Sequence, residues 1–316
     1  MTLPKSSKIY RRSGGDIPQT LRLKTEDLPS TLKADEVLIR IHAVSLNYRD
    51  VAMLHGKYPA EILEKGVPVS DCAAEVISVG SEVHDFKAGD YVGSIFDLNN
   101  LTGMEDKSAA LGGEVEGVLR GICCLQSGCS LASAEVSFMG GACIPCAGVT
   151  AWNALNMPRT SGTALLLGTG GVSMFALLIC LAAGIRPIIT SSSDEKLDAL
   201  KAFGNVVIEN GGPSTADKSL ASISRRGVVS LVGFLGGFNV EAQPNLLLPT
   251  LQKTARIQGI AVGSKIDQRN LCDFLSEKKV ALKGIIDKRV FSFEESQAAF
   301  DYLYSGQHVG KVIIKL

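Results

Sequence analysis

Residues 163–184 read TALLLGTGGVSMFALLICLAAG, and this stretch decides the fold. Residues 163–167 form a short apolar run without alternation, which is typical of a strand buried on both faces. Residues 173–183 read as a helix, and Gly184 is a usual C-terminal stop. The loop between them, Gly168-Thr169-Gly170-Gly171-Val172-Ser173, lets the backbone approach a pyrophosphate at a helix N-terminus. This context predicts a dinucleotide-binding βα unit, with an ordinary glycine-rich turn as the alternative.

The end of the next expected strand, residues 186–190, indicates which dinucleotide is bound. A strand that serves NAD usually ends in an Asp or Glu that holds the ribose 2′-OH. Here residues 190–196 read TSSSDEK. The hydroxyls and Lys196 can donate to a 2′-phosphate, while Asp194 can help start the following helix. We therefore expect NADP(H) in preference to NAD(H); a polar loop with a helix cap is the alternative.

The remaining pattern divides the chain into a strand-rich part and an alternating part. Strands that alternate with helices predict parallel βαβ units in a doubly wound sheet. Val37, Ile39, Ile41 and Ala43 share one face of an expected half-buried strand, and closely spaced turns in the first ~100 residues suit a small barrel-like β domain. Strands are expected at 35–46, 73–79, 89–96, 206–209, 228–233, about 255–262 and 309–315, and helices at 148–155, 194–203, 268–280 and 294–304.

Composition limits the classes of function. The 316 residues include 46% apolar residues, enough for about two domains. Lys plus Arg and Asp plus Glu are 32 each, which argues against a general nucleic-acid binder. Glycines and Arg186-Pro187 interrupt the long apolar stretch at 163–190, so we expect no membrane span. Without a secretory signal, the eight cysteines are expected as free thiols in the cytosol.

Several further motifs follow one another along residues 35–316. Together with the glycine loop they resemble the medium-chain dehydrogenase/reductase superfamily, and within it the zinc-free quinone and enoyl reductase branch, including fungal alcohol dehydrogenase-like proteins. The resemblance implies an α/β chain, with a GroES-like catalytic domain at 1–140 and 285–316 and an NADP-binding Rossmann domain at 141–284. The motifs are SLNYRD at 45–50, GKYP at 56–59, DFKAGD at 85–90, PCAGVTAW at 145–152, ENGG at 209–212 and GKV at 310–312.

The same resemblance argues against zinc. Zinc-dependent relatives hold the metal with a Cys, the His of a Gly-His-Glu motif and a later Cys. Here Asn47 takes the first position, residues 69–75 contain no His, and only Cys146 matches the third. One soft ligand does not make a tetrahedral site. Residues 73–122 also lack the four cysteines of a structural zinc lobe.

Without a metal, developing oxyanion charge must be stabilised by hydrogen bonds. The resemblance implies Tyr58 as proton donor near the nicotinamide, with a packing aromatic as the alternative and Tyr48 as a rival. Asn47 is expected to orient the substrate or the nicotinamide ribose, and Asp50 either joins it or only caps local backbone. The catalytic residues expected are Tyr58, Asn47 and Asp50; the cofactor-binding residues expected are Thr150, Gly168, Gly170, Gly171, Val172, Ser191, Ser192, Ser193, Lys196, Asn210, Gly211, Phe234, Leu235 and Lys311.

Two segments depart from the family pattern. Gly204 is followed at once by the strand at 206–209, so roughly one βα unit at the sheet edge is missing, and right-handed crossover then favours the 194–203 helix on the opposite face of the sheet. Residues 121–141 are rich in Cys and Ser without clear periodicity, where the family has a regular strand.

The expected function is NADPH-dependent reduction of an activated C=C bond or a quinone, and the fungal likeness suggests secondary metabolism. A cofactor-binding protein with lost or weak turnover and a carbonyl or alcohol dehydrogenase are the alternatives. A small-molecule substrate is the expected partner, without nucleic acid or membrane, and a homodimer is left open.

Overall fold

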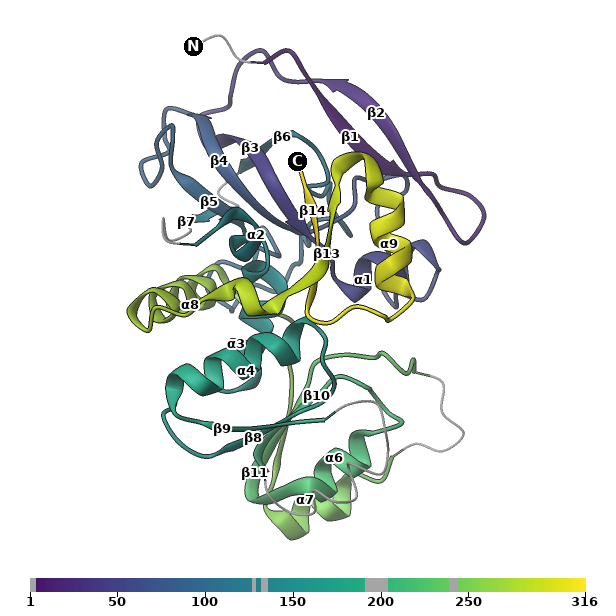
Figure 1. The fold of residues 1–316 in the computed structure, drawn as a ribbon, viewed down its shortest axis with the longest axis vertical. Coiled ribbons are helices and arrows are strands. Elements are labelled where there is room, and N and C mark those ends of the chain that lie inside the picture. The colour runs from purple at the N-terminus through teal and green to yellow at the C-terminus, as the bar shows by residue number, and fades with distance from the viewer. Residues whose placement is uncertain (1–3, 127–128, 132–135, 191–203, 239–243) are drawn as a thin grey trace. The chain divides into compact units, whose positions relative to one another are not determined.

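The computed structural model describes residues 4–126, 129–131, 136–190, 204–238 and 244–316. The chain divides into two compact units (Figure 1). Unit 1 comprises Met1–Cys146, Ser264–Glu277 and Ala281–Leu316, and unit 2 comprises Ala147–Gly263 and Lys278–Val280. The predicted domains placed 265–284 with the Rossmann part, whereas the helix at 265–277 belongs to unit 1. Its Gln268 Nε2 donates to Ser94 O at 2.9 Å, and its Lys265 N donates to Asn100 O at 2.9 Å.

Unit 1 is built on a seven-stranded sheet with the order β13-β14-β3-β4-β5-β7, and β6 also pairs with β3. The pairing is antiparallel except between β13 and β14. The predicted face of β3 is confirmed for Val37, Ile39 and Ile41, which lie in the main core. After the register shift between Ile41 and Ala43, Val44 joins this core in place of Ala43. The strands are β3 (Glu36–Ser45), β4 (Asp71–Val79), β5 (Tyr91–Ser94), β6 (Ile122–Gln126), β7 (Cys129–Leu131), β13 (Ile286–Ser292) and β14 (Lys311–Lys315), with β1 (Ser6–Arg12) and β2 (Leu21–Asp27) as a separate antiparallel pair.

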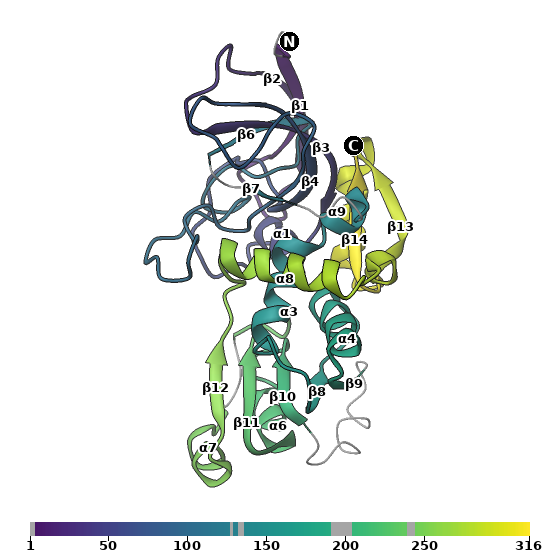
Figure 2. The same cartoon turned by 90° about the vertical axis from the view of Figure 1, so that its left-hand side faces the viewer.

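Short helices surround this sheet, and α1 and α9 lie side by side (Figures 1 and 2). The C-terminal strand β14 joins the sheet beside β3, so residues from the two ends of the chain meet there. This pairing brings Lys311 next to the start of α1. The helices of unit 1 are α1 (Tyr48–Leu54), α2 (Phe138–Gly141), α8 (Lys265–Glu277) and α9 (Ser296–Tyr304), with short helical turns η2 (Leu282–Ile285) and η3 (Phe293–Glu295); the π-helical turn η1 (Ile144–Gly148) leads into unit 2.

Unit 2 is a parallel five-stranded sheet with the order β12-β11-β10-β8-β9. Helices α3 and α4 lie on one face and α6 on the other (Figures 1 and 2), so the doubly wound arrangement is confirmed. Gly184 ends α4 in the left-handed conformation, as predicted. The strands are β8 (Thr163–Leu166), β9 (Arg186–Ile189), β10 (Gly204–Glu209), β11 (Ile223–Leu231) and β12 (Arg256–Gly259), and the helices are α3 (Val149–Ala154), α4 (Gly171–Ala183), α6 (Ala216–Ser222) and α7 (Leu247–Lys253).

The two segments that depart from the family pattern have different outcomes. In the described part of unit 2, β9 is the sheet edge on the side where the missing unit was expected; the predicted helix at 194–203 lies outside the described residues. The absence of regular structure suggested for 121–141 is wrong at its start. Residues of β6 pair with β3 at five positions, from Glu36↔Gln126 to Arg40↔Ile122, so non-local pairing forms a strand that local periodicity does not show.

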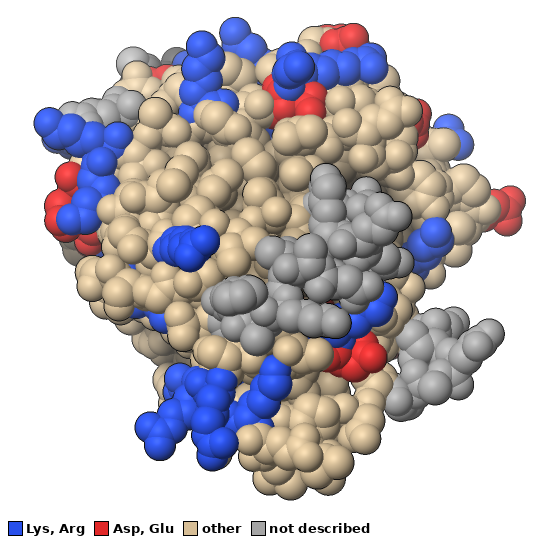
Figure 3. All heavy atoms as spheres, turned by 60° about the horizontal axis from the view of Figure 1, so that its bottom comes forward, with Lys and Arg blue, Asp and Glu red and all other residues tan. Residues whose placement is uncertain are grey.

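Charged side chains are unevenly spread over the face shown in Figure 3. Lys and Arg form a cluster at the lower left of that view and are scattered along its top and sides, while much of the visible area between them is uncharged. This face therefore lacks the continuous basic stripe of a general nucleic-acid binder. Among the described residues, no helix combines the length and the apolar character needed to cross a bilayer.

Candidate active site

The start of α1 organises the candidate site in unit 1. Asn47 is the N-cap, and the side chain of Asp50 accepts a hydrogen bond from its backbone N–H at 2.8 Å. The capping alternative for Asp50 is therefore present in the structure. Asp50 is 1% exposed, and its second oxygen has no partner among the described residues. Burial raises the pKa of Asp50 to about 6, against the opposing effect of Arg49.

The side chain of Asn47 joins a buried polar network. The ammonium of Lys311, 2% exposed, donates to Asn47 Oδ1 and, at 2.8 Å, to Leu46 O. On the other side, Asn47 Nδ2 donates to Ser70 Oγ at 3.4 Å, and Ser70 Oγ donates to Asp71 Oδ1 at 2.6 Å. Asp71 Oδ2 lies 3.8 Å from Lys311 Nζ.

These residues do not fit a catalytic zinc ion. At the position of the first expected ligand, Asn47 Oδ1 already faces an ammonium, which repels a metal cation. At the third, the backbone N–H of Cys146 donates to Asp71 Oδ2 at 3.1 Å, and burial raises the pKa of its thiol to about 12. Among the described residues, no group of three or more His, Cys, Asp or Glu side chains is placed to hold a metal.

Tyr58 lies beside Arg49, a residue for which the sequence suggested no role. The Arg49 guanidinium carbon is 5.4 Å from the centre of the Tyr58 ring and 4.7 Å from that of Phe96. Arg49 Nη1 also donates to Leu111 O at 2.7 Å. Burial acts to lower the pKa of Arg49, but Asp50 and Tyr58 together raise it above its ordinary value. Tyr58 is therefore a half-buried phenol next to a fixed cation, while the rival Tyr48 packs against the main core.

In unit 2, the glycine loop forms a cradle that lacks side chains. Gly168 has φ +78°, which favours glycine, and a Cβ at Gly168 or Gly170 meets no atom within 4 Å among the described residues. Internal packing therefore does not explain the glycine at position 170. Gly170 is the N-cap of α4, and it makes no side-chain cap hydrogen bond. These features fit a bound pyrophosphate.

A second loop is tied to this cradle. Asn210 Nδ2 donates to Leu167 O at 3.1 Å and to Ser173 Oγ at 3.2 Å. The fully buried Glu209 accepts from the backbone of Gly211 and Gly212 and from two side-chain hydroxyls. Parallel strands end at one edge of a sheet, which is where ligands bind in such folds. The loops after β8 and β10 therefore form one connected surface.

The other predicted cofactor residues are placed as follows. Leu235 N donates to Asn210 O at 3.1 Å, so the loop after β11 joins the same surface, and the rings of Phe234 and Phe238 stack. Thr150 is buried in α3, and Gly171 and Val172 form the first turn of α4. Ser191, Ser192, Ser193 and Lys196 lie outside the described residues.

The residues that sequence reasoning missed are Arg49, Ser70 and Asp71. Arg49 and Asp71 stand inside or beside motifs that the sequence displays, but their roles depend on partners far along the chain. The Asn47–Lys311 contact spans 264 positions. The resemblance implied Lys311 as a cofactor-binding residue; the structure places its ammonium on Leu46 O and Asn47 Oδ1, because β14 pairs with β3 beside the start of α1.

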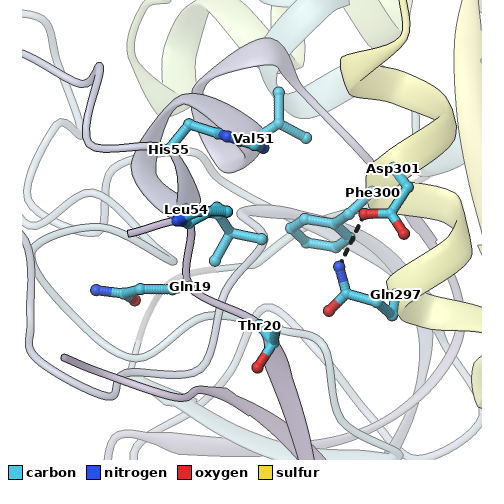
Figure 4. Close-up of a pocket in the computed structure, with 9 residues that line it drawn as sticks. Gln19, Thr20, Val51, Leu54, His55, Gln297, Phe300 and Asp301 are labelled. Atoms are coloured by element: carbon cyan, nitrogen blue, oxygen red, sulfur yellow. Dashed lines mark hydrogen bonds between the residues drawn. The ribbon is translucent and has the colours of Figure 1, made fainter. Parts of the chain in front are cut away.

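A separate pocket of about 260 Å³ lies in unit 1, and none of the candidate-site residues described above lines it. Figure 4 shows Phe300 between Leu54 and Gln297, while Gln297 Nε2 donates to Asp301 Oδ1 at 2.9 Å. The polar ends of Gln297 and Asp301 thus satisfy one another. We assign this pocket no role. It is lined by Pro18, Gln19, Thr20, Val51, Leu54, His55, Gln297, Phe300 and Asp301.

Comparison with known families agrees with this architecture. Residues 33–158 match the alcohol dehydrogenase GroES-like domain, and residues 185–314 match the zinc-binding dehydrogenase domain. The chain is 35% identical to the zinc-type alcohol dehydrogenase-like protein C1773.06c of Schizosaccharomyces pombe, over 93% of this chain and 95% of that protein. The chain therefore belongs to the medium-chain dehydrogenase/reductase superfamily, and it is an oxidoreductase of that family.

Two kinds of relative are informative within the superfamily. The 2-methylene-furan-3-one reductase of Solanum lycopersicum is 29% identical over 99% of this chain and 80% of that protein. A putative alcohol dehydrogenase of Sinorhizobium meliloti 1021 superposes with a TM-score of 0.85, 28% identity, and coverage of 99% and 100%. A 2-octenoyl-CoA carboxylase reductase, solved with NADP and 2-octenoyl-CoA, shares the fold at a TM-score of 0.83, 18% identity, and coverage of 99% and 88%.

Proposed function

We propose that this protein is an NADP(H)-dependent reductase that adds hydride to an activated C=C bond, of an enone or enoyl compound, or to a quinone, without zinc. One observation carries the proposal: an ammonium and an amide stand where a metal site would need ligands. With no Lewis acid at that place, substrate oxygen must be polarised by hydrogen bonds. A conjugated acceptor suits such a site because its charge spreads over an enolate or phenolate.

The cofactor residues have defined parts in this proposal. A reduced nicotinamide supplies the hydride. Gly168, Gly170 and the first turn of α4 would hold the pyrophosphate, and Asn210 and Gly211 would bind the ribose. Thr150, Phe234 and Leu235 would bind the nicotinamide. The three serines at 191–193 and Lys196 would bind the 2′-phosphate and so select NADP(H).

The residues of unit 1 act on the substrate. Asn47 donates a hydrogen bond to an oxygen of the substrate or of the ribose. Tyr58 supplies a proton to the reduced product, and the Arg49 guanidinium lies beside its ring. Asp50 holds the backbone of Asn47 and so fixes the start of α1. We expect a small-molecule substrate and a cytosolic location.

The curated relatives named as alcohol dehydrogenases favour a second candidate, reduction of a plain carbonyl. One panel separates the two: NADPH oxidation with enones, quinones and aldehydes, each followed by product analysis. Saturated ketone from an enone supports the proposal, whereas allylic alcohol as the sole product contradicts it. NADPH binding with no turnover on any member favours a binding protein that has lost catalysis.

A further inference from the structure

The side-chain amide of Asn47 is held between two groups of fixed hydrogen-bonding polarity. The Lys311 ammonium has only donors, so the atom that faces it is Oδ1. Ser70 Oγ uses its proton on the Asp71 carboxylate at 2.6 Å, so it accepts from Asn47 Nδ2. A flipped amide would place N–H groups against an ammonium. The chemistry of its neighbours therefore sets the orientation of this amide.

Burying a lysine ammonium in a protein core is energetically unfavourable. A buried ammonium is stabilised only where hydrogen bonds and charge compensate for lost water. Lys311 obtains them from Leu46 O, Asn47 Oδ1 and the nearby Asp71, on separate segments of unit 1. An apolar side chain on β14 would pack there without this cost. What the ammonium adds is a fixed polarity for Asn47.

This arrangement determines which hydrogen bonds the Asn47 side-chain amide can still form with a ligand. Its oxygen is occupied, and one of the two Nδ2 protons points to Ser70. Among the described residues, Ser70 Oγ is the one acceptor that Asn47 Nδ2 has, so its other proton is available to a ligand. Asn47 can therefore offer a ligand a hydrogen-bond donor but not an acceptor.

We propose that Lys311 is a positioning residue that locks Asn47 as a hydrogen-bond donor to the carbonyl oxygen of an α,β-unsaturated substrate. This rests on the proposed function and narrows its substrate class to acceptors with a carbonyl oxygen. Hydride from the reduced nicotinamide forms a C–H bond at the β-carbon, the C=C pair moves toward oxygen, and the Asn47 N–H stabilises the enolate. The α-carbon then takes a proton from Tyr58 or water, and the nicotinamide is left oxidised.

Two substitutions test the role with 2-cyclohexenone as substrate. Lys311→Met removes the donors at similar length, and Asn47→Asp keeps the oxygen that faces Lys311 but loses the N–H. Each should lower kcat/KM by about 10²-fold, the usual cost of one oxyanion donor. The double variant should be no worse than the worse single one, because both remove the same function. The Kd for NADPH should stay within about twofold of wild type, equivalent to about 0.4 kcal/mol.

Lys315→Met is the matched control, because Lys315 is an exposed lysine on the same strand. It should leave kcat/KM unchanged. If Lys311→Met does not fold, Asn47→Asp decides the question, since its isosteric side chain retains the Lys311 contact. Wild-type kcat/KM in folded Asn47→Asp, or in folded Lys311→Met, would overturn the proposal.

A spectroscopic measurement separates this inference from the proposed reaction. With ¹⁵N-labelled asparagine, the Nδ2 signals of Asn47 are those lost in Asn47→Asp. Cyclohexanone added with NADP⁺ should shift one of the two protons downfield in wild type and Lys315→Met, but not in Lys311→Met. This shift without enone turnover would sustain the positioning role and refute the proposed reaction. Enone turnover with no shift, or the same shift in Lys311→Met, would refute the positioning role alone.

Discussion

At the scale of single residues, Asn47 links the backbone of the site to its chemistry. Its N–H is capped by Asp50, and its side chain joins Lys311 to Ser70. The family resemblance implies a Cys zinc ligand at this position in zinc-dependent relatives. In this chain the residue is Asn47, and its amide forms hydrogen bonds instead. The sequence identified Asn47 because the motif is local. It could not identify Lys311 as its partner, because strand β14 reaches α1 only through sheet pairing.

Asp50 gives a pH-dependent prediction. Its pKa is raised on folding, from the ordinary 3.8 to about 6, so the fold disfavours the charged form. The free-energy cost of the charged Asp50 carboxylate in the folded protein is absent below about pH 4, grows between about pH 4 and pH 6, and is complete above that interval. The free energy of unfolding of wild type minus that of Asp50→Asn should therefore fall as pH rises from 4 to 6.5, by about 2–3 kcal/mol. Denaturant unfolding at several pH values checks this, and a difference that stays constant or increases would contradict it.

Tyr58 gives a kinetic prediction. A positioned general acid contributes about 10²–10⁴-fold, so Tyr58→Phe should lower kcat by at least about 10²-fold with NADPH affinity near wild type. Tyr48→Phe is the control and should have a smaller effect, because that ring packs against the core. Stopped-flow measurement of the hydride and proton steps distinguishes them. Full kcat in Tyr58→Phe, with chemistry rate-limiting, would point to water or a ribose hydroxyl as the donor.

At the scale of elements, the loops after β8, β10 and β11 are joined by hydrogen bonds into one surface. Glu209 has the central part, since it accepts from the Gly211 and Gly212 N–H groups and from Thr215. The Gly168–Ser173 motif predicted the first of these loops. The sequence did not indicate that Glu209 holds the second loop through its hydrogen bonds. Its partners follow it by two to ten positions, a spacing with no periodic signal.

Gly170 tests the cradle without disturbing the fold. Its φ is −76° and a Cβ there meets no described atom within 4 Å, so Gly170→Ala should leave the free energy of unfolding within about 0.5 kcal/mol of wild type. The new methyl group would stand where the pyrophosphate approaches, so the Kd for NADPH should rise at least about tenfold, or 1.4 kcal/mol. Gly259→Ala is the control, because that glycine is equally unobstructed but lies on β12. Equal NADPH affinity in the two variants, measured by fluorescence titration, would place the dinucleotide elsewhere.

Elements with a strong local pattern were predictable, and several elements without one were missed. Strand β3 alternates and α4 ends in a glycine stop, so both were predicted close to their observed bounds. Helices α6 and α7 were missed: each has seven residues and no side-chain hydrogen bond at its N-cap among the described residues. Strand β6 was missed because it depends on β3, more than eighty positions earlier.

At the scale of the whole molecule, the described sheet of unit 2 has an edge strand, β9, on the side where the sequence predicts that one βα unit is missing. The order β12-β11-β10-β8-β9 retains the strands that carry the cradle, and β9 stands at the edge on the affected side. Loss of an edge unit removes the fewest pairings, so the core of Leu165, Val207 and Val229 persists. The fold was predictable at this scale because the order of the motifs along the chain defines it. The exact boundary between the two units was not predictable, because α8 belongs to unit 1 through hydrogen bonds to a loop that is distant in the sequence.

The shortened region bears on cofactor choice, which gives a prediction for the whole protein. The hydroxyl-rich segment at 190–196 without an acid at the strand end should favour a 2′-phosphate. NADPH should therefore bind at least about tenfold more tightly than NADH, a difference of about 1.4 kcal/mol. Fluorescence titration with both cofactors checks this. Lys196→Ala should reduce the difference between the two dissociation constants, mainly by weakening NADPH binding. Equal dissociation constants in wild type would refute the assignment.

We propose that this protein reduces conjugated acceptors with NADPH and without a metal. The most direct measurement is NADPH oxidation with 2-cyclohexenone by enzyme dialysed against a chelator, with zinc quantified in the same sample and the product identified. We predict far less than one zinc per chain, undiminished activity and cyclohexanone as the product. Zinc bound at one ion per chain and activity lost with the metal, or cyclohexenol in place of cyclohexanone, would contradict the account.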